Sequence, residues 1–96
     1  MSLDTYINCF EGCNMRHLEA LAMLGLAIEV NVENCEKNRF KKIVMRLYDG
    51  RTISSMCYFE EEVEQSIRII NTYINIAKKN NAIGKLKIVE ETKIEE

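Results

Sequence analysis

Apolar residues repeat along the chain with two different periods, and each period predicts a different kind of element. Residues 60–79 show the period of an amphipathic helix, with apolar residues three and four positions apart. Glutamates gather at the start of this segment and Lys78-Lys79 at its end, which suits the helix dipole, and Asn80-Asn81 and Gly84 end it. The repeating positions are Val63, Ile67, Ile70, Ile74 and Ala77.

A second helix is predicted over residues 15–28. Asn14 is a suitable N-cap residue, and the residues after it are mostly strong helix formers. Apolar residues occupy nearly every side of this segment, which is typical of a buried helix. Gly25 is expected inside the helix, where its lack of a side chain would allow close packing.

Alternation of apolar and polar residues predicts strands elsewhere in the chain. Residues 28–33 alternate over a short stretch, and residues 40–48 and 51–59 flank Asp49-Gly50 as the two arms of a hairpin. Residues 85–94 alternate as a final strand, and residues 3–10 lean toward a strand around Thr5-Tyr6-Ile7.

The length of the hairpin loop decides which side chains share a face. A two-residue loop would mix apolar and charged residues on both faces, whereas a three-residue loop with Gly50 in a left-handed bulge separates them. The predicted core face holds Ile43, Met45, Leu47, Ile53, Cys57 and Phe59. The opposite face holds Phe40, Lys42, Val44, Arg46, Thr52, Ser54, Met56 and Tyr58.

These elements predict one small α+β domain over residues 1–96. Two helices would pack on one face of a mostly antiparallel sheet of three to five strands, in the order (β)αβββαβ. If residues 28–33 are not a strand and the N-terminal strand is real, the order becomes the ferredoxin-like βαββαβ.

The composition indicates the class of protein and its cellular location. The chain is 47% hydrophobic and 29% charged with a net charge of −2, which is typical of a globular protein and gives no overall attraction to nucleic acid or anionic membranes. No apolar run approaches the roughly 20 residues that span a bilayer, and the N-terminus has no leader pattern, so we expect a cytoplasmic protein. The four cysteines are then expected as free thiols, although intracellular proteins of hyperthermophiles can carry disulfides.

Catalytic signatures are absent from the sequence. It contains no dinucleotide-binding or phosphate-binding glycine motif and no nucleophile elbow, so we expect neither an enzyme nor a bound cofactor. One alternative hypothesis for function is a zinc or thiol site at Cys9, Cys13 and His17, with Cys35 or Cys57 as a fourth ligand. On a continuous helix these three residues would span about 12 Å, which is too far for one ion.

The outward face of the 40–59 hairpin is the candidate binding surface. It mixes aromatic residues, methionine and arginine, as protein interfaces do, so we expect a binding or regulatory module that forms a homodimer or acts as a small adaptor or inhibitor. Cations beside aromatic rings also suit a nucleic acid, which is the alternative partner. The candidate residues are Phe40, Lys42, Arg46, Met56, Tyr58 and Arg51.

Overall fold

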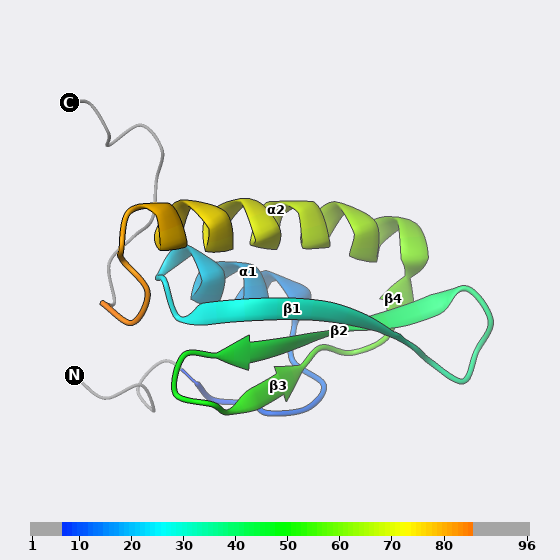
Figure 1. Ribbon diagram of the computed structural model, residues 1–96. Helices are drawn as coiled ribbons and strands as arrows, with labels where there is room; N and C mark the ends of the chain where they lie inside the picture. Colours follow the sequence, from blue (N-terminus) through cyan, green and yellow to red (C-terminus); the bar gives the residue numbers. More distant parts are fainter. Residues whose placement is uncertain (1–6, 86–96) are drawn as a thin grey trace.

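The computed structural model describes residues 7–85 and has the α+β class that the sequence predicts (Figure 1). The predicted final strand and residues 1–6 lie outside the described residues, and residues 7–9 are not in a strand. The elements are α1 (Met15–Met23), β1 (Ala27–Asn34), β2 (Phe40–Leu47), β3 (Thr52–Ser54), β4 (Tyr58–Phe59) and α2 (Glu60–Lys79).

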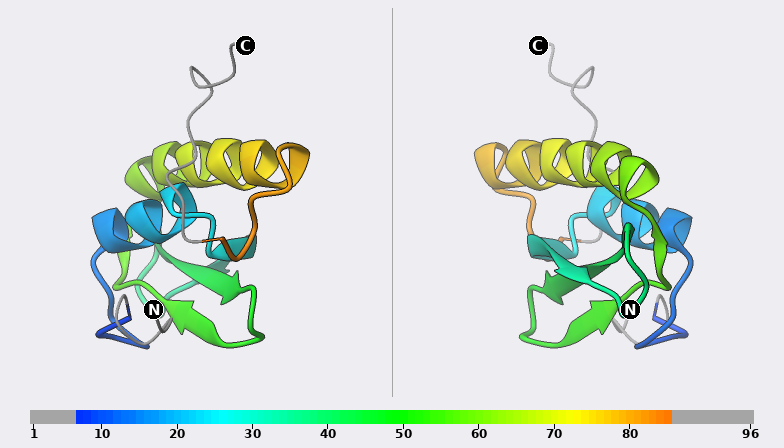
Figure 2. Two further views of the ribbon diagram at one scale, coloured as in Figure 1. Left: turned by 90° about the vertical axis from the view of Figure 1, so that its left-hand side faces the viewer. Right: turned by 90° about the vertical axis from the view of Figure 1, so that its right-hand side faces the viewer.

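The strands form an antiparallel sheet with β2 in its middle. β1 pairs with one edge of β2, and both β3 and β4 pair with the other. The strand expected over residues 28–33 is present as part of β1, and the ferredoxin-like alternative required its absence. Both helices lie on the same side of the sheet, as predicted (Figures 1 and 2).

Helix α1 begins where expected and ends earlier. The side-chain oxygen of Asn14 accepts a hydrogen bond from the backbone N–H of Arg16 at 2.8 Å, which confirms the N-cap. The prediction that Gly25 lies inside the helix was wrong. Gly25 lies just after the helix and has φ +77°. The N–H groups of Gly25 and Leu26 bond to the carbonyls of Ala22 and Leu21, so this glycine ends the helix.

Helix α2 follows its predicted stripe. Val63, Ile70, Ile74 and Ala77 are buried, and Ile67 is half-buried. A polar contact joins the two helices, because the buried Ser66 hydroxyl donates to a carboxylate oxygen of Glu19 at 2.6 Å.

The loop between β2 and β3 has the predicted three residues. Met45 pairs with Ile53 and Arg46 with Thr52, which leaves residues 48–50 as the loop, and Gly50 has φ +97°. The register therefore places alternate residues of β2 and β3 on the helix side, where they are buried. The core collects Ile7, Leu18, Leu21, Ala22, Leu26, Ala27, Ile43, Met45, Leu47, Ile53, Val63, Ile70 and Ile74.

The second arm of the hairpin departs from the prediction of one strand over residues 51–59. The Ser55 hydroxyl accepts the N–H of Ile43 at 2.9 Å, at the place where a regular ladder would use a backbone carbonyl. The N–H of Ser55 still donates to the carbonyl of Ile43 at 2.8 Å, and the chain leaves the ladder after this residue. It returns at β4, where Phe59 pairs with Phe40 and Tyr58 with Lys41, one residue out of step with β3. This shift exchanges the two faces beyond residue 55, because side chains alternate along a strand.

Candidate functional site

The face of the sheet opposite the helices is the candidate site, and we call it the outer face. Among residues 7–85, no helix lies over it (Figure 2). Every second residue of β2 points to it, since Ile43, Met45 and Leu47 between them are buried beneath the helices. Its residues are Glu29, Asn31 and Glu33 of β1; Phe40, Lys42, Val44 and Arg46 of β2; Thr52 and Ser54 of β3; and Phe59 of β4.

An aromatic pair occupies one end of the outer face. The rings of Phe40 and Phe59 stack with their centroids 4.9 Å apart and their planes 14° apart. The guanidinium of Arg39 lies 5.9 Å from the Phe59 centroid, within the range of a cation–π contact. Phe59 is nevertheless 48% exposed, so half of a large apolar side chain is open to solvent.

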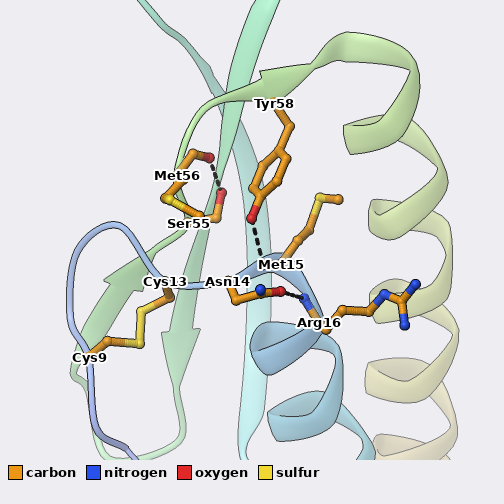
Figure 3. Close-up of a disulfide and its surroundings, with 8 residues drawn as sticks. All are labelled: Cys9, Cys13, Asn14, Met15, Arg16, Ser55, Met56 and Tyr58. Carbon is orange, nitrogen blue, oxygen red and sulfur yellow. Dashed lines mark hydrogen bonds between the residues drawn. A yellow bond between two sulfur atoms is a disulfide. The ribbon is translucent and has the colours of Figure 1, made fainter.

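Tyr58 is not part of this surface, which corrects its predicted outward position. It is half-buried, packs against the core, and its hydroxyl accepts the N–H of Met15 at 3.2 Å (Figure 3). The predicted core residues Cys57 and Phe59 are exposed for the same reason, namely the register shift at Ser55. The signal for this shift in the sequence is Ser54-Ser55, which interrupts an otherwise regular strand with residues whose hydroxyls compete for backbone hydrogen bonds.

Charges on the outer face form two parallel rows of opposite sign. Glu29 and Glu33 lie on β1, in register with Arg46 and Lys42 of β2. One pair is in contact, with a guanidinium nitrogen of Arg46 3.4 Å from a carboxylate oxygen of Glu29. We call Glu29 and Glu33 the acidic row, and Lys42 and Arg46 the basic row.

Two predicted surface residues lie away from this face. Arg51 lies at the end of the β2–β3 loop, with its Nε 2.7 Å from a carboxylate oxygen of Asp49. The backbone N–H and the guanidinium of Arg51 hold the pKa of Asp49 below its ordinary value. Met56 lies between β3 and β4, is 47% exposed, and is close to Gly12 of the N-terminal segment.

All four cysteines form disulfides, so the expectation of free thiols was wrong. Cys9 bonds to Cys13 and Cys35 bonds to Cys57, with Cα–Cα distances of 5.7 and 6.4 Å. The Cys9–Cys13 bond lies beside the start of α1 (Figure 3), where Cys13 donates its N–H to Ser54 and accepts that of Met56.

The zinc or thiol hypothesis at Cys9, Cys13 and His17 receives no support, because sulfurs in a disulfide are not thiolates. The described residues contain no group of three side chains placed to hold a metal ion. His17 lies in α1, where its Nε2 is buried without a hydrogen-bond partner in the described part of the chain.

A hollow of about 610 Å³ lies beside the Cys35–Cys57 bond, and we call it the hairpin groove. Both cysteines line it, at the end of the sheet where the β1–β2 hairpin extends beyond the helices (Figure 1). Cys57 is exposed and Cys35 is half-buried. The other residues that line the groove are Asn34, Glu36, Lys37, Phe40 and Lys42.

Neither helix within residues 7–85 combines the length and apolar character needed to cross a membrane. Comparisons with models of protein families, with curated proteins and with solved structures find no match to this chain.

Proposed function

We propose that this protein is a non-enzymatic binding module that associates with a second copy of itself through the outer face. The observation that carries the proposal is the combination of a half-exposed phenylalanine stack with two charged rows that complement each other. Apolar side chains exposed together on a protein of this size usually mark a contact surface. Aromatic and arginine residues are also the types that interfaces favour.

Charge complementarity selects a second copy as the partner. A two-fold axis that runs parallel to the strands, between β1 and β2, places the acidic row of each copy over the basic row of the other. Because Glu29 is in register with Arg46 and Glu33 with Lys42, each carboxylate would then face a cation of the partner copy. Opposite charges that meet in this way fix the register of an interface and suppress wrong partners.

The size of the face indicates a weak, reversible dimer. With this axis, β1 and β2 of each copy overlap: eight residues of strand extend about 26 Å, and two neighbouring strands are about 10 Å wide. A patch of this order is smaller than a standard specific interface and lies in the range of weak, transient contacts. We therefore expect a dissociation constant in the micromolar range, so association should depend on protein concentration.

Pairing of the arginines argues against the nucleic-acid alternative. Arg46 contacts Glu29, Arg51 contacts Asp49, and Arg39 contacts Glu61 at 3.0 Å. A carboxylate beside each of these three guanidinium groups repels phosphate, whereas phosphate-binding surfaces need cations in excess. The alternative within this proposal is an adaptor or inhibitor that binds a different protein. Sedimentation velocity distinguishes that role from self-association.

The disulfides also change the proposed location. We propose that the protein works where disulfides persist, either outside the reducing cytoplasm or inside a hyperthermophile, which would keep the expected cytoplasmic location. Alkylation of any free thiols at the moment of cell lysis, followed by mass spectrometry, tests this. Four alkylated cysteines would contradict it.

Sedimentation velocity over a range of concentrations tests the dimer. The all-acidic variant Lys42→Glu/Arg46→Glu and the all-basic variant Glu29→Lys/Glu33→Lys should each stay monomeric, because like charges would face one another. An equimolar mixture of the two should form a one-to-one dimer, because each row again meets its opposite. Circular dichroism of each variant establishes that it is folded.

Two results would contradict self-association through the outer face. The wild-type chain could remain monomeric at every concentration, which would leave only a different protein as partner. The two variants could instead dimerise as well as the wild type, which would place the contact elsewhere on the surface.

A further inference from the structure

The Cys35–Cys57 disulfide is the most accessible reactive bond among the described residues. Cys57 is exposed, and both cysteines line the hairpin groove. In the other disulfide, Cys13 is only 1% exposed, and its backbone is hydrogen-bonded to Ser54 and Met56. Access to sulfur is one of the factors that decide how fast a disulfide exchanges, so the two bonds should differ in reactivity.

Contacts other than the disulfide also hold the two cysteines near each other. Cys35 donates its backbone N–H to the carbonyl of Phe40 at 3.0 Å. Two residues after Cys57, Phe59 pairs with Phe40 and stacks on its ring. Glu60 donates its N–H to the carbonyl of Arg39 at 3.1 Å. Opening the disulfide therefore leaves strand pairing in place, and the two thiols stay positioned to re-form the bond.

The charges around the groove favour a thiolate and an anionic ligand. Lys37 and Lys42 line the groove together with one carboxylate, Glu36. Lysine ammonium groups stabilise a neighbouring thiolate and lower the pKa of a cysteine, which makes it a better leaving group. The excess of positive charge also attracts a thiol that carries carboxylates.

We propose that the hairpin groove is a thiol-exchange site, at which a small thiol that carries carboxylates attacks the Cys35–Cys57 bond. The ligand thiolate, having lost its proton to solvent, attacks Sγ of the exposed Cys57. A bond forms between the ligand and Cys57, the Cys35–Cys57 bond breaks, and its electron pair leaves on Cys35, which takes a proton from solvent.

A second ligand thiol completes the exchange by attacking the ligand sulfur of the mixed disulfide. The products are a ligand disulfide and two protein thiols, so two electrons pass from the ligand to the protein. The reaction is stoichiometric and needs no other oxidant, because the protein disulfide is itself the oxidant. The inference does not depend on self-association, since both cysteines are accessible in the single chain.

Glutathione, a tripeptide thiol with two carboxylates, is the probe. The native full-length protein is incubated with it, quenched by alkylation and mapped by mass spectrometry. We expect Cys35 and Cys57 to be modified while Cys9 and Cys13 remain bonded. At equal thiolate concentration, glutathione should react several-fold faster than the cationic thiol cysteamine, and about 1 M salt should remove that preference because it screens the lysines.

Lys37→Gln tests the groove, and Lys78→Gln at the end of α2 is the matched control. Lys37→Gln should reduce the preference for glutathione over cysteamine, and Lys78→Gln should leave it unchanged. Three results would overturn the proposal: the Cys9–Cys13 bond opens first, Cys35–Cys57 opens only when circular dichroism shows unfolding, or glutathione has no advantage over cysteamine. These readouts are independent of the sedimentation experiment, so one proposal can fail without the other.

Discussion

The two halves of strand β2 are stabilised in different ways. In the half that contains Ile43, Met45 and Leu47, the helix-facing side chains have no measurable exposure and lie in the core. In the half that begins at Phe40, every residue from Phe40 to Lys42 is partly exposed, and the hairpin extends beyond α2 (Figure 1). There, a disulfide, a ring stack and exposed ion pairs of Arg39 replace burial.

This difference shows that one continuous strand can belong to two regions of unequal stability. Burial of apolar side chains stabilises the first half through the whole core, so it should open only on global unfolding. A covalent bond and a few exposed contacts stabilise the second half, so its stability depends on redox conditions and salt. The candidate surface and the hairpin groove both include residues of this second half.

Truncation in the buried half should have the largest effect. Leu47→Ala removes a side chain with no exposure from the core, and we expect a loss of about 2–5 kcal/mol in the free energy of unfolding. Urea denaturation followed by circular dichroism measures it. Thr52→Ala, on the exposed outer side of the neighbouring strand, is the control and should change stability by about 0.5 kcal/mol or less. Equal losses would contradict the assignment of the two faces.

Removal of the covalent link should have the next largest effect. Cys35→Ser/Cys57→Ser releases a loop with a sequence separation of 22, and the unfolded chain should gain entropy worth about 3 kcal/mol. Cys9→Ser/Cys13→Ser, with a separation of 4, should cost about 2 kcal/mol by the same relation.

Hydrogen exchange then separates the two halves of β2. In Cys35→Ser/Cys57→Ser, amides near Phe40 should exchange faster, whereas those of Met45 should follow global unfolding. Equal acceleration along the whole strand would mean that the two halves open together.

A substitution in the β2–β3 loop should have a smaller effect. Gly50 has φ +97°, a conformation that L-residues with a side chain rarely adopt, and an added Cβ would meet nothing within 4 Å. Gly50→Ala should therefore lose about 1 kcal/mol from backbone strain alone. Gly50→Asn should lose less, because asparagine tolerates left-handed conformations better. The comparison of the two melting temperatures tests this reason.

The smallest effect should come from the carboxylate of Asp49. Because contacts with Arg51 lower its pKa in the folded state, this group stabilises the fold above its ordinary pKa, and the stabilisation is lost as the pH falls through the lowered value. Asp49→Asn should therefore melt slightly below the wild type near neutral pH, and the gap should close in acid. A gap that widens in acid would contradict this assignment.

Much of the fold follows from local patterns in the sequence. The stripe of α2, the Asn14 cap and the three-residue loop at Gly50 each depend on neighbouring residues, and the structure confirms all three. The end of α1 also depends on neighbouring residues. We predicted that Gly25 allows close packing inside the helix, whereas its role in the structure is to end the helix. Of the predicted surface, Phe40, Lys42 and Arg46 do share one face.

The remaining features depended on contacts between distant residues. The Ser55 hydroxyl accepts the N–H of Ile43, twelve residues earlier, which a regular ladder would direct to a backbone carbonyl. The register beyond this point places Phe59 rather than Tyr58 beside Phe40. The pairing of the cysteines likewise depends on which chain segments the fold brings within bonding distance. The sequence by itself determined the two helices, strands β1 and β2, and the buried face of the sheet as far as Ser55, because periodicity is a local property. Only the tertiary structure decided the register beyond Ser55 and the disulfides, because both require segments that meet after folding.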